Sequence, residues 1–179
     1  MLPADWDRLL ADHTAALEEY QASAMSLSLE TWTRPMAPGK WTPAEVTSHV
    51  TEAYRVLRGE LGGQAGMSLR GSRLRRFILR HTALPRLLAG KPFPPGVRAP
   101  RETRPRIVVD DRQTALKELG SLAELFTTEL GACAGPARPC LTHAYFGLLS
   151  PRQALQLLAV HTRHHARQLA ACRQFPTLS

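Results

Sequence analysis

The sequence predicts an all-α protein that folds as a single four-helix bundle. Apolar residues recur at helical spacing in four long stretches, and no strand-like run is longer than the IVV of residues 107–109. With 179 residues, 44% of them hydrophobic, the chain can bury one core without disulfides or metals as staples. We therefore expect residues 1–179 to form one domain, with an arginine- and proline-rich insertion between the second and third helices.

The first two helices are predicted from their apolar stripes and from one clear starting signal. Residues 4–27 carry large apolar side chains at helical spacing, with acidic and polar residues between them. The second helix begins at Thr42, which suits the N-cap, with Pro43 in the first helical position. Glu45 can reach back to complete a capping box, and the helix should run to about Leu61.

The second half of the chain predicts two more long helices. Residues 64–109 contain a short arginine-rich amphipathic pattern and then five prolines over fifteen residues, which favour extended loop. The third helix is expected to start near Asp110 or Asp111, either of which can cap it, and to end at Gly131. The fourth opens with a second capping-box pattern, SPRQ, and should cover residues 150–173.

Positive charge is concentrated in one segment. The chain has a net charge of +8, and residues 70–106 hold eleven lysines or arginines against one acid, Glu102. Dense positive charge attracts phosphates, so a nucleic-acid or anionic-surface binding module is one candidate function. Only Phe77 and Phe93 are interleaved with these basic residues, however, so stacking platforms for bases are scarce. We rank a solvated basic face above a nucleic-acid partner.

The sequence indicates neither a targeting signal nor a set of paired cysteines. The first residues, MLPADWDRLLADH, carry three aspartates and no basic leader, and no apolar run is long enough for a membrane span. The three cysteines, Cys133, Cys140 and Cys172, are odd in number and lack CxxC spacing, although a Cys133 to Cys140 bridge stays open. We expect a soluble, cytoplasmic protein without a membrane partner.

Three histidines crowd the stretch HTRHHARQL, and the helical repeat separates their directions. With about 100° per residue and Arg152 at zero, His161 lies near 180°, His165 near 220° and His164 near 120°. The first two therefore point into the bundle one turn apart, a spacing at which two imidazoles can meet one cation. His49, on the inward face of the second helix, is the best candidate for a third ligand.

Structural roles compete with ligation for every histidine. The inward pair can be hydrogen-bonded core residues, and we prefer that interpretation for His13 and His81. His143 belongs to a loop and could cap a helix end or approach the site. Glu52, about one turn beyond His49, is a candidate to orient a ligand or to act as a base. Three neutral imidazoles would leave a coordination position open, as in catalytic metal sites.

Two segments, GKWTPAEVTSHV and THAYFGLLSPRQALQLLAVHTRHHARQL, resemble the DinB-like superfamily of bacterial four-helix-bundle proteins. That superfamily includes YfiT-like proteins described as metal-dependent hydrolases, and the bacillithiol and mycothiol S-transferases. The resemblance implies a metal triad of His49, His161 and His165, the same three that the helical angles select. It also implies a divalent ion such as zinc or nickel, a small-molecule substrate and frequently a homodimer. Residues 64–106 depart from the usual pattern.

The predicted function is therefore a metal-dependent enzyme, either a thiol-dependent S-transferase or a hydrolase. In the first case the cofactor would include a low-molecular-weight thiol, whose carboxylates the loop arginines could bind. Two alternatives remain. One is the nucleic-acid or anionic-surface binding module built on residues 70–106. The other is a bundle that binds a metal or a small molecule without turnover.

Overall fold

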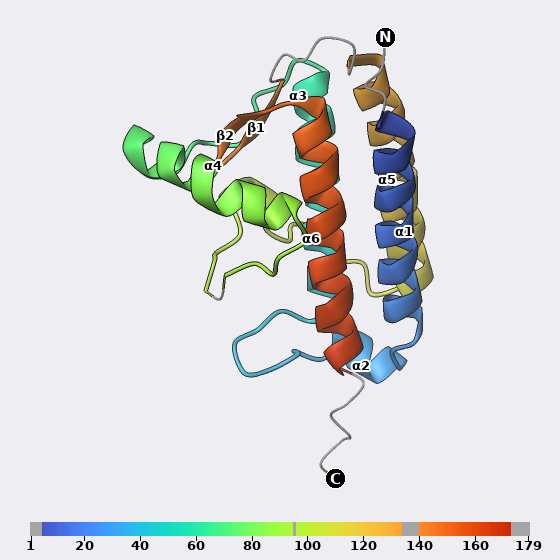
Figure 1. Cartoon of the computed structure of the whole chain (residues 1–179). Coiled ribbons are helices and arrows are strands. Elements are labelled where there is room, and N and C mark those ends of the chain that lie inside the picture. The colour runs from blue at the N-terminus through green and yellow to red at the C-terminus, as the bar shows by residue number, and fades with distance from the viewer. Residues whose placement is uncertain (1–4, 95, 134–139, 173–179) are drawn as a thin grey trace.

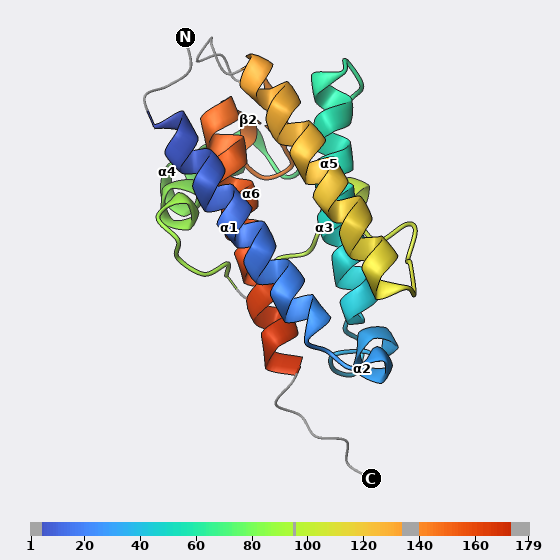
Figure 2. The ribbon, with the colours of Figure 1, turned by 90° about the vertical axis from the view of Figure 1, so that its right-hand side faces the viewer.

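The computed structural model describes residues 5–94, 96–133 and 140–172. The chain is mostly helical, as predicted, and four long helices lie side by side in both views of the ribbon (Figures 1 and 2). They are α1 (Trp6–Met25), α3 (Pro43–Leu61), α5 (Arg112–Cys133) and α6 (Pro151–Ala171). α1 packs along α6 and α3 packs along α5, while α3 and α6 also touch each other. The last contact brings the histidine-bearing helices together.

Both predicted capping boxes are present and fix where α3 and α6 begin. The Thr42 hydroxyl accepts the Glu45 N–H at 3.0 Å, and the Glu45 carboxylate accepts the Thr42 N–H at 2.8 Å. Ser150 and Gln153 make the same pair of bonds at the start of α6. Each box satisfies backbone donors that have no partner inside the helix. The register of all histidines on these two helices follows from these starts.

The core between the helices is built from large side chains that also make polar contacts. Tyr20 and Tyr54 are fully buried, and each finds a hydrogen-bond partner for its hydroxyl. The Tyr20 hydroxyl lies 2.7 Å from Thr47 Oγ1, and the Tyr54 hydroxyl lies 2.7 Å from Nε2 of His13. His13 is thus a hydrogen-bonded core residue, as expected.

Residues 62–111 connect α3 to α5 and include two helical elements, α4 (Arg73–Leu88) and η1 (Arg101–Thr103). α4 confirms the short amphipathic pattern, and the proline-rich stretch after it is loop apart from η1. His81, expected in the core, is instead exposed on α4, where its ring centroid lies 4.4 Å from that of Phe77. The expectation was wrong because, within the described part of the chain, His81 lies on a face of α4 that stays exposed.

One short helix and a two-stranded hairpin were missed because their elements are too short to show a period. α2 (Leu29–Thr33) is a helix of five residues, and β1 (Leu141–His143) pairs antiparallel with β2 (Gly147–Leu149). Strands of three residues cannot display alternation. Gly147 follows the hairpin loop with φ of 73°, a left-handed conformation that glycine adopts without a steric penalty.

Helix ends account for the remaining differences. α5 does not end at Gly131 but continues to Cys133, because a glycine lowers helix stability without breaking the hydrogen-bond ladder. Of the two cap candidates for α5, Asp111 is the one whose carboxylate accepts a backbone N–H, that of Thr114 at 2.7 Å.

All three cysteines are free thiols. Within the described ranges, no helix is both long and apolar enough to cross a bilayer.

Candidate metal centre

Three histidine side chains from α3 and α6 converge. Nε2 of His161 lies 3.1 Å from Nε2 of His49 and 3.1 Å from Nε2 of His165. One nitrogen of each ring falls within 4.8 Å of the other two, and such a group could hold a metal ion. The two residues that helical angles place one turn apart on α6 therefore do face the same point, together with the predicted histidine of α3.

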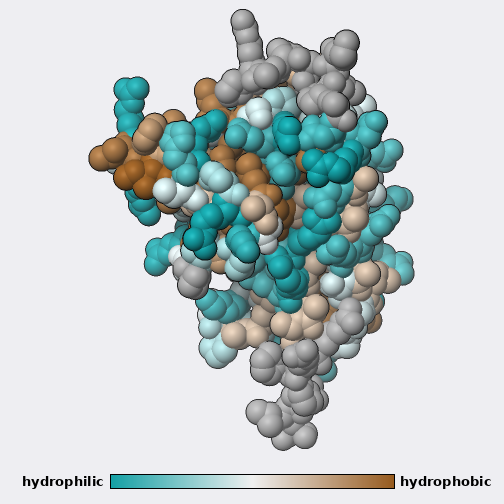
Figure 3. Space-filling model, in the orientation of Figure 1, coloured by the Kyte–Doolittle hydropathy of each residue, from teal (hydrophilic) through white to brown (hydrophobic). Residues whose placement is uncertain are grey.

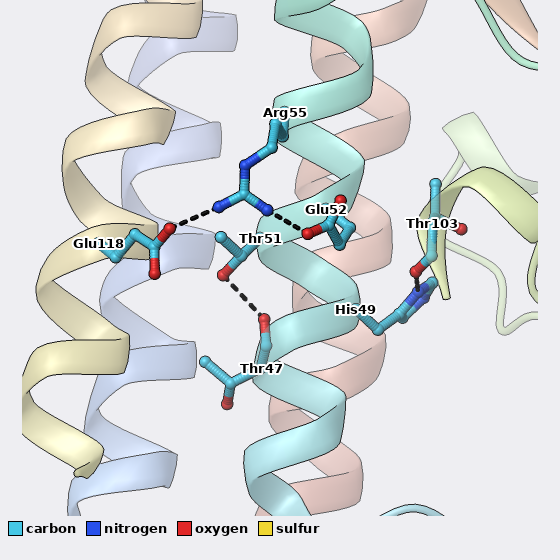
Figure 4. Close-up of polar contacts among 7 residues, drawn as sticks. All are labelled: Thr47, His49, Thr51, Glu52, Arg55, Thr103 and Glu118. Carbon is cyan, nitrogen blue, oxygen red and sulfur yellow. Dashed lines mark hydrogen bonds and ion pairs between the residues drawn. The ribbon is translucent and has the colours of Figure 1, made fainter. Parts of the chain in front are cut away.

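Contacts behind two of the rings determine which nitrogen carries the proton. His49 Nδ1 donates to the backbone carbonyl of Thr103 at 2.6 Å (Figure 4). His165 Nδ1 lies 2.8 Å from Oε1 of Gln168, which can only accept. Each ring is thereby fixed as the tautomer whose Nε2 bears a lone pair, and both lone pairs face His161. Such second contacts are usual for metal-ligating histidines.

The convergence leaves the three rings incompletely satisfied without a cation. A proton on His161 Nε2 could be donated to only one of the two facing lone pairs. Nδ1 of His161 is itself buried and has no hydrogen-bond partner among the described residues. Buried polar groups are normally paired, so this donor set fits a positively charged ligand held by the three Nε2 atoms.

Burial also keeps the three imidazoles neutral. It lowers the pKa of His49, lowers the pKa of His161 well below its usual range, and lowers the pKa of His165 to about 3. Repulsion between neighbouring rings acts in the same direction on His161. A metal binds the neutral imidazole, so these side chains need not lose a proton to ligate at neutral pH.

A family comparison agrees with this arrangement. Residues 12–169 match the family model described as the DinB superfamily. The chain belongs to the DinB superfamily. The matched range includes all of α3 and most of α6, and it contains His49, His161 and His165. No curated protein and no solved structure matches the chain.

In this DinB superfamily protein an open cleft extends from the histidines. Its walls are formed by α3, α4, α6, the β1–β2 hairpin and the loop that follows α4. Two aromatic rings flank the candidate ligands: the ring centroid of Trp41 lies 5.1 Å from that of His49, and the ring centroid of Phe93 lies 6.0 Å from that of His161. The three histidines therefore line a space that a small molecule can enter.

Charged residues on the cleft wall are mainly basic. The basic side chains that line it are Lys40, Arg70, Arg75, Arg98 and Arg104. Glu45, the one acid among the described lining residues, already belongs to the capping box of α3. Part of the charge in residues 70–106 thus faces the cleft instead of forming a purely solvated surface.

The other nearby histidines are not part of the triad. His164 lies on the flank of α6, as predicted, and its Nε2 is 3.1 Å from the amide nitrogen of Gln168. His143 lies on β1 and lines the cleft, where its ring stacks on Phe146 with centroids 4.5 Å apart. Of the two roles left open for His143, the structure supports an approach to the site. Burial lowers its pKa to about 4.

Glu52 is held by an arginine of its own helix and not by a histidine. Its carboxylate pairs with Arg55, which also donates to Glu118 of α5 at 2.5 Å (Figure 4). Among the described contacts of Glu52 none joins it to a histidine, and it is not among the residues that line the cleft. Three positions along a helix leave two side chains roughly 60° apart, so Glu52 neighbours His49 on α3, and it is the ion pair with Arg55 that engages its carboxylate.

Sequence reasoning missed the residues that orient the rings. Gln168 stands three positions after His165, a spacing that could have revealed it. Thr103 could not be found in this way, because it contributes its backbone carbonyl from η1, inside the proline-rich segment. Only the tertiary packing of η1 against α3 brings that carbonyl to His49.

Proposed function

We propose that this DinB superfamily protein binds a divalent metal ion, zinc or nickel, through His49, His161 and His165. We further propose that it is a metal-dependent enzyme, a thiol-dependent S-transferase or a hydrolase. The observation that carries this proposal is the convergence of three Nε2 atoms at the inner end of a cleft, two of them with their lone pairs fixed toward the third. Histidine-only sites with an open position are typical of catalytic metals.

The residues of the chain have separate tasks in this proposal. His49 and His165 are held by the Thr103 carbonyl and Gln168, so their lone pairs need no reorientation on binding. A divalent cation bound there would lower the pKa of a water or thiol ligand and so supply a nucleophile at neutral pH. Trp41 and Phe93 place apolar rings beside His49 and His161, and an apolar environment strengthens electrostatic interactions at the site.

The cleft supports a substrate or cofactor with an apolar part and an anionic part. Leu157 and Leu158 of α6 and Val46 of α3 provide apolar wall close to the histidines. Arg98 and Arg104, from the loop that follows α4, also line the cleft, and guanidinium groups bind carboxylates in a fixed geometry. The carboxylates of a low-molecular-weight thiol have this chemistry.

Metal content tests the first half of the proposal. We expect untagged wild-type protein loaded with zinc or nickel to retain about one equivalent after desalting, as a three-histidine site would. His49→Ala should lose this metal, whereas His81→Ala, the same change at an exposed histidine outside the site, should keep it. Equal metal content in wild type and His49→Ala, measured by plasma mass spectrometry, would contradict the proposed ligand set.

An activity screen tests the second half. Loaded protein is offered several low-molecular-weight thiols with a chloroarene electrophile, where the thiol sulfur forms the new bond and chloride leaves, and separately a set of activated esters. We expect a metal-dependent rate in one of these assays that His49→Ala loses and His81→Ala retains. Stoichiometric metal without any turnover would instead assign the chain to the non-catalytic binding proteins.

A further inference from the structure

The first two turns of α4 present apolar side chains to solvent. Leu74, Phe77 and Ile78 are 69%, 61% and 49% exposed, and their spacing places them on one face of the helix. We call these three residues the α4 patch. Figure 3 shows hydrophobic surface where this end of α4 projects, at the left of the molecule. Single exposed apolar residues are ordinary, whereas a contiguous group marks an interaction surface.

The remainder of α4 is anchored to the protein. Leu84 and Leu87 in its C-terminal half are buried, and Leu79 lines the cleft. Figure 1 shows the N-terminal half standing away from the four long helices. The Arg80 guanidinium donates to the backbone carbonyls of Phe146 and Leu148, which ties α4 to the β1–β2 hairpin. The α4 patch is therefore carried on a firmly attached but projecting helix.

Arginines surround the α4 patch. The sequence of α4, RLRRFILRHTALPRLL, contains five arginines and no acidic residue. Four of them, Arg73, Arg75, Arg76 and Arg80, lie within two turns of the patch residues. An arginine stem can lie along apolar surface while its guanidinium reaches an anionic group. At roughly 100° per residue Arg73 and Arg75 flank Leu74, whereas Arg76 and Arg80 donate to backbone carbonyls. The projecting half of α4 is thus apolar along one face and basic beside it.

We propose that this half of α4 docks onto the surface of an anionic lipid bilayer. An amphipathic helix with apolar and aromatic residues on one face and arginines beside them is suited to the headgroup region. Negative headgroups complement the arginines, and the acyl boundary accepts the patch. A second copy using the same surface would bring two sets of arginines together with no acid on α4 to compensate. The expectation of no membrane partner was based on the lack of a membrane-spanning segment, and this proposal replaces it with binding at the bilayer surface.

Vesicle flotation tests the proposal with the full chain. We expect wild type to float with phosphatidylcholine vesicles that contain phosphatidylglycerol, to bind pure phosphatidylcholine at least tenfold less, and to be released by salt. The triple change Leu74→Ser, Phe77→Ser and Ile78→Ser should lower binding at least tenfold. Leu125→Ser, the control, removes an apolar side chain that is 47% exposed on α5 and should leave binding unchanged. Circular dichroism and thermal unfolding confirm that each variant is folded.

Three results would overturn the proposal. The first is a flotation assay at low salt in which wild type does not float with anionic vesicles, or floats no better than the triple variant. The second is a wild-type dimer, seen by light scattering, that the triple variant dissociates while neither protein binds vesicles. The third is retardation of duplex DNA that Arg73→Gln with Arg76→Gln abolishes and the triple variant retains. None of these depends on whether the histidines hold a metal.

Discussion

His49 and His161 are 112 positions apart in the chain, yet their Nε2 atoms lie 3.1 Å from each other. The contact joins α3 to α6, and the proton on His49 is committed to the Thr103 carbonyl on the other side of the ring. A lone pair of His49 therefore points at the half-buried ring of His161, whose own buried Nδ1 has no hydrogen-bond partner among the described residues. Such an arrangement is costly unless a cation occupies the space between the rings.

Metal should consequently stabilise the fold. A ligand at a hundredfold excess over its Kd adds about 2.7 kcal/mol to the free energy of unfolding, or about 5 to 10 °C in Tm for a chain of this size. We expect zinc or nickel to raise the Tm of metal-free wild type by this amount in differential scanning calorimetry. His161→Ala should show no rise. A similar rise in His161→Ala would mean that the metal binds elsewhere.

Gln168 should govern metal affinity without contacting the ion. Gln168→Leu keeps the side-chain size but removes the acceptor for His165 Nδ1. Loss of such an outer contact typically weakens metal binding by about 10- to 100-fold. Competition with a chromogenic chelator measures the change. Gln156→Leu, the same substitution on α6 away from the cleft lining, should have no effect, and equal affinities for both variants would refute the orienting role.

Arg55 should matter for stability and not for metal content. Arg55→Ala leaves the buried Glu52 carboxylate, 3% exposed, without its ion-pair partner, which should cost about 3 kcal/mol in urea unfolding. Arg34→Ala breaks an exposed pair with Glu30 and should cost less than about 1 kcal/mol. A normal metal content in Arg55→Ala would support a structural role for Glu52 as the ion-pair partner of Arg55. Loss of metal would reinstate Glu52 as part of the site.

The buried His13 should make the folded protein less stable in mild acid. Burial lowers its pKa to about 4, so between pH 6.5 and pH 4 the unfolded chain binds a proton that the folded chain does not. Stability therefore falls as pH drops through this window, by about 3 kcal/mol from this residue. His13→Gln, which keeps a polar group beside the Tyr54 hydroxyl, should flatten the pH dependence. Parallel curves for the two proteins would exclude this contribution.

The sequence predicted those features that depend only on residues close together in the chain, namely helix starts and the directions of side chains along a helix. Both capping boxes, and the directions of His161, His164 and His165 on α6, follow from helical geometry alone, and the structure confirms them. The choice of His49 needed more than spacing, because nothing along the chain states that α3 and α6 touch. There the resemblance to the DinB-like superfamily added information that periodicity lacks.

Other features depend on packing that no short window contains. The β1–β2 hairpin is too short to alternate, and the exposure of His81 reflects the projection of α4 from the four long helices. Thr103 acts through a backbone carbonyl, which any residue type could supply. Glu52 lies about one turn after His49, as its spacing indicates, but the spacing does not reveal that Arg55 binds its carboxylate.

X-ray absorption spectroscopy of untagged protein loaded with zinc would test the central claim most directly. We expect three imidazole nitrogens at about 2.0 to 2.1 Å and at least one further oxygen ligand that an added thiol replaces with sulfur. His49→Ala should remove the three-imidazole signature. A sphere closed by four protein ligands, or one with fewer than three imidazoles in wild type, would contradict an open site formed by His49, His161 and His165.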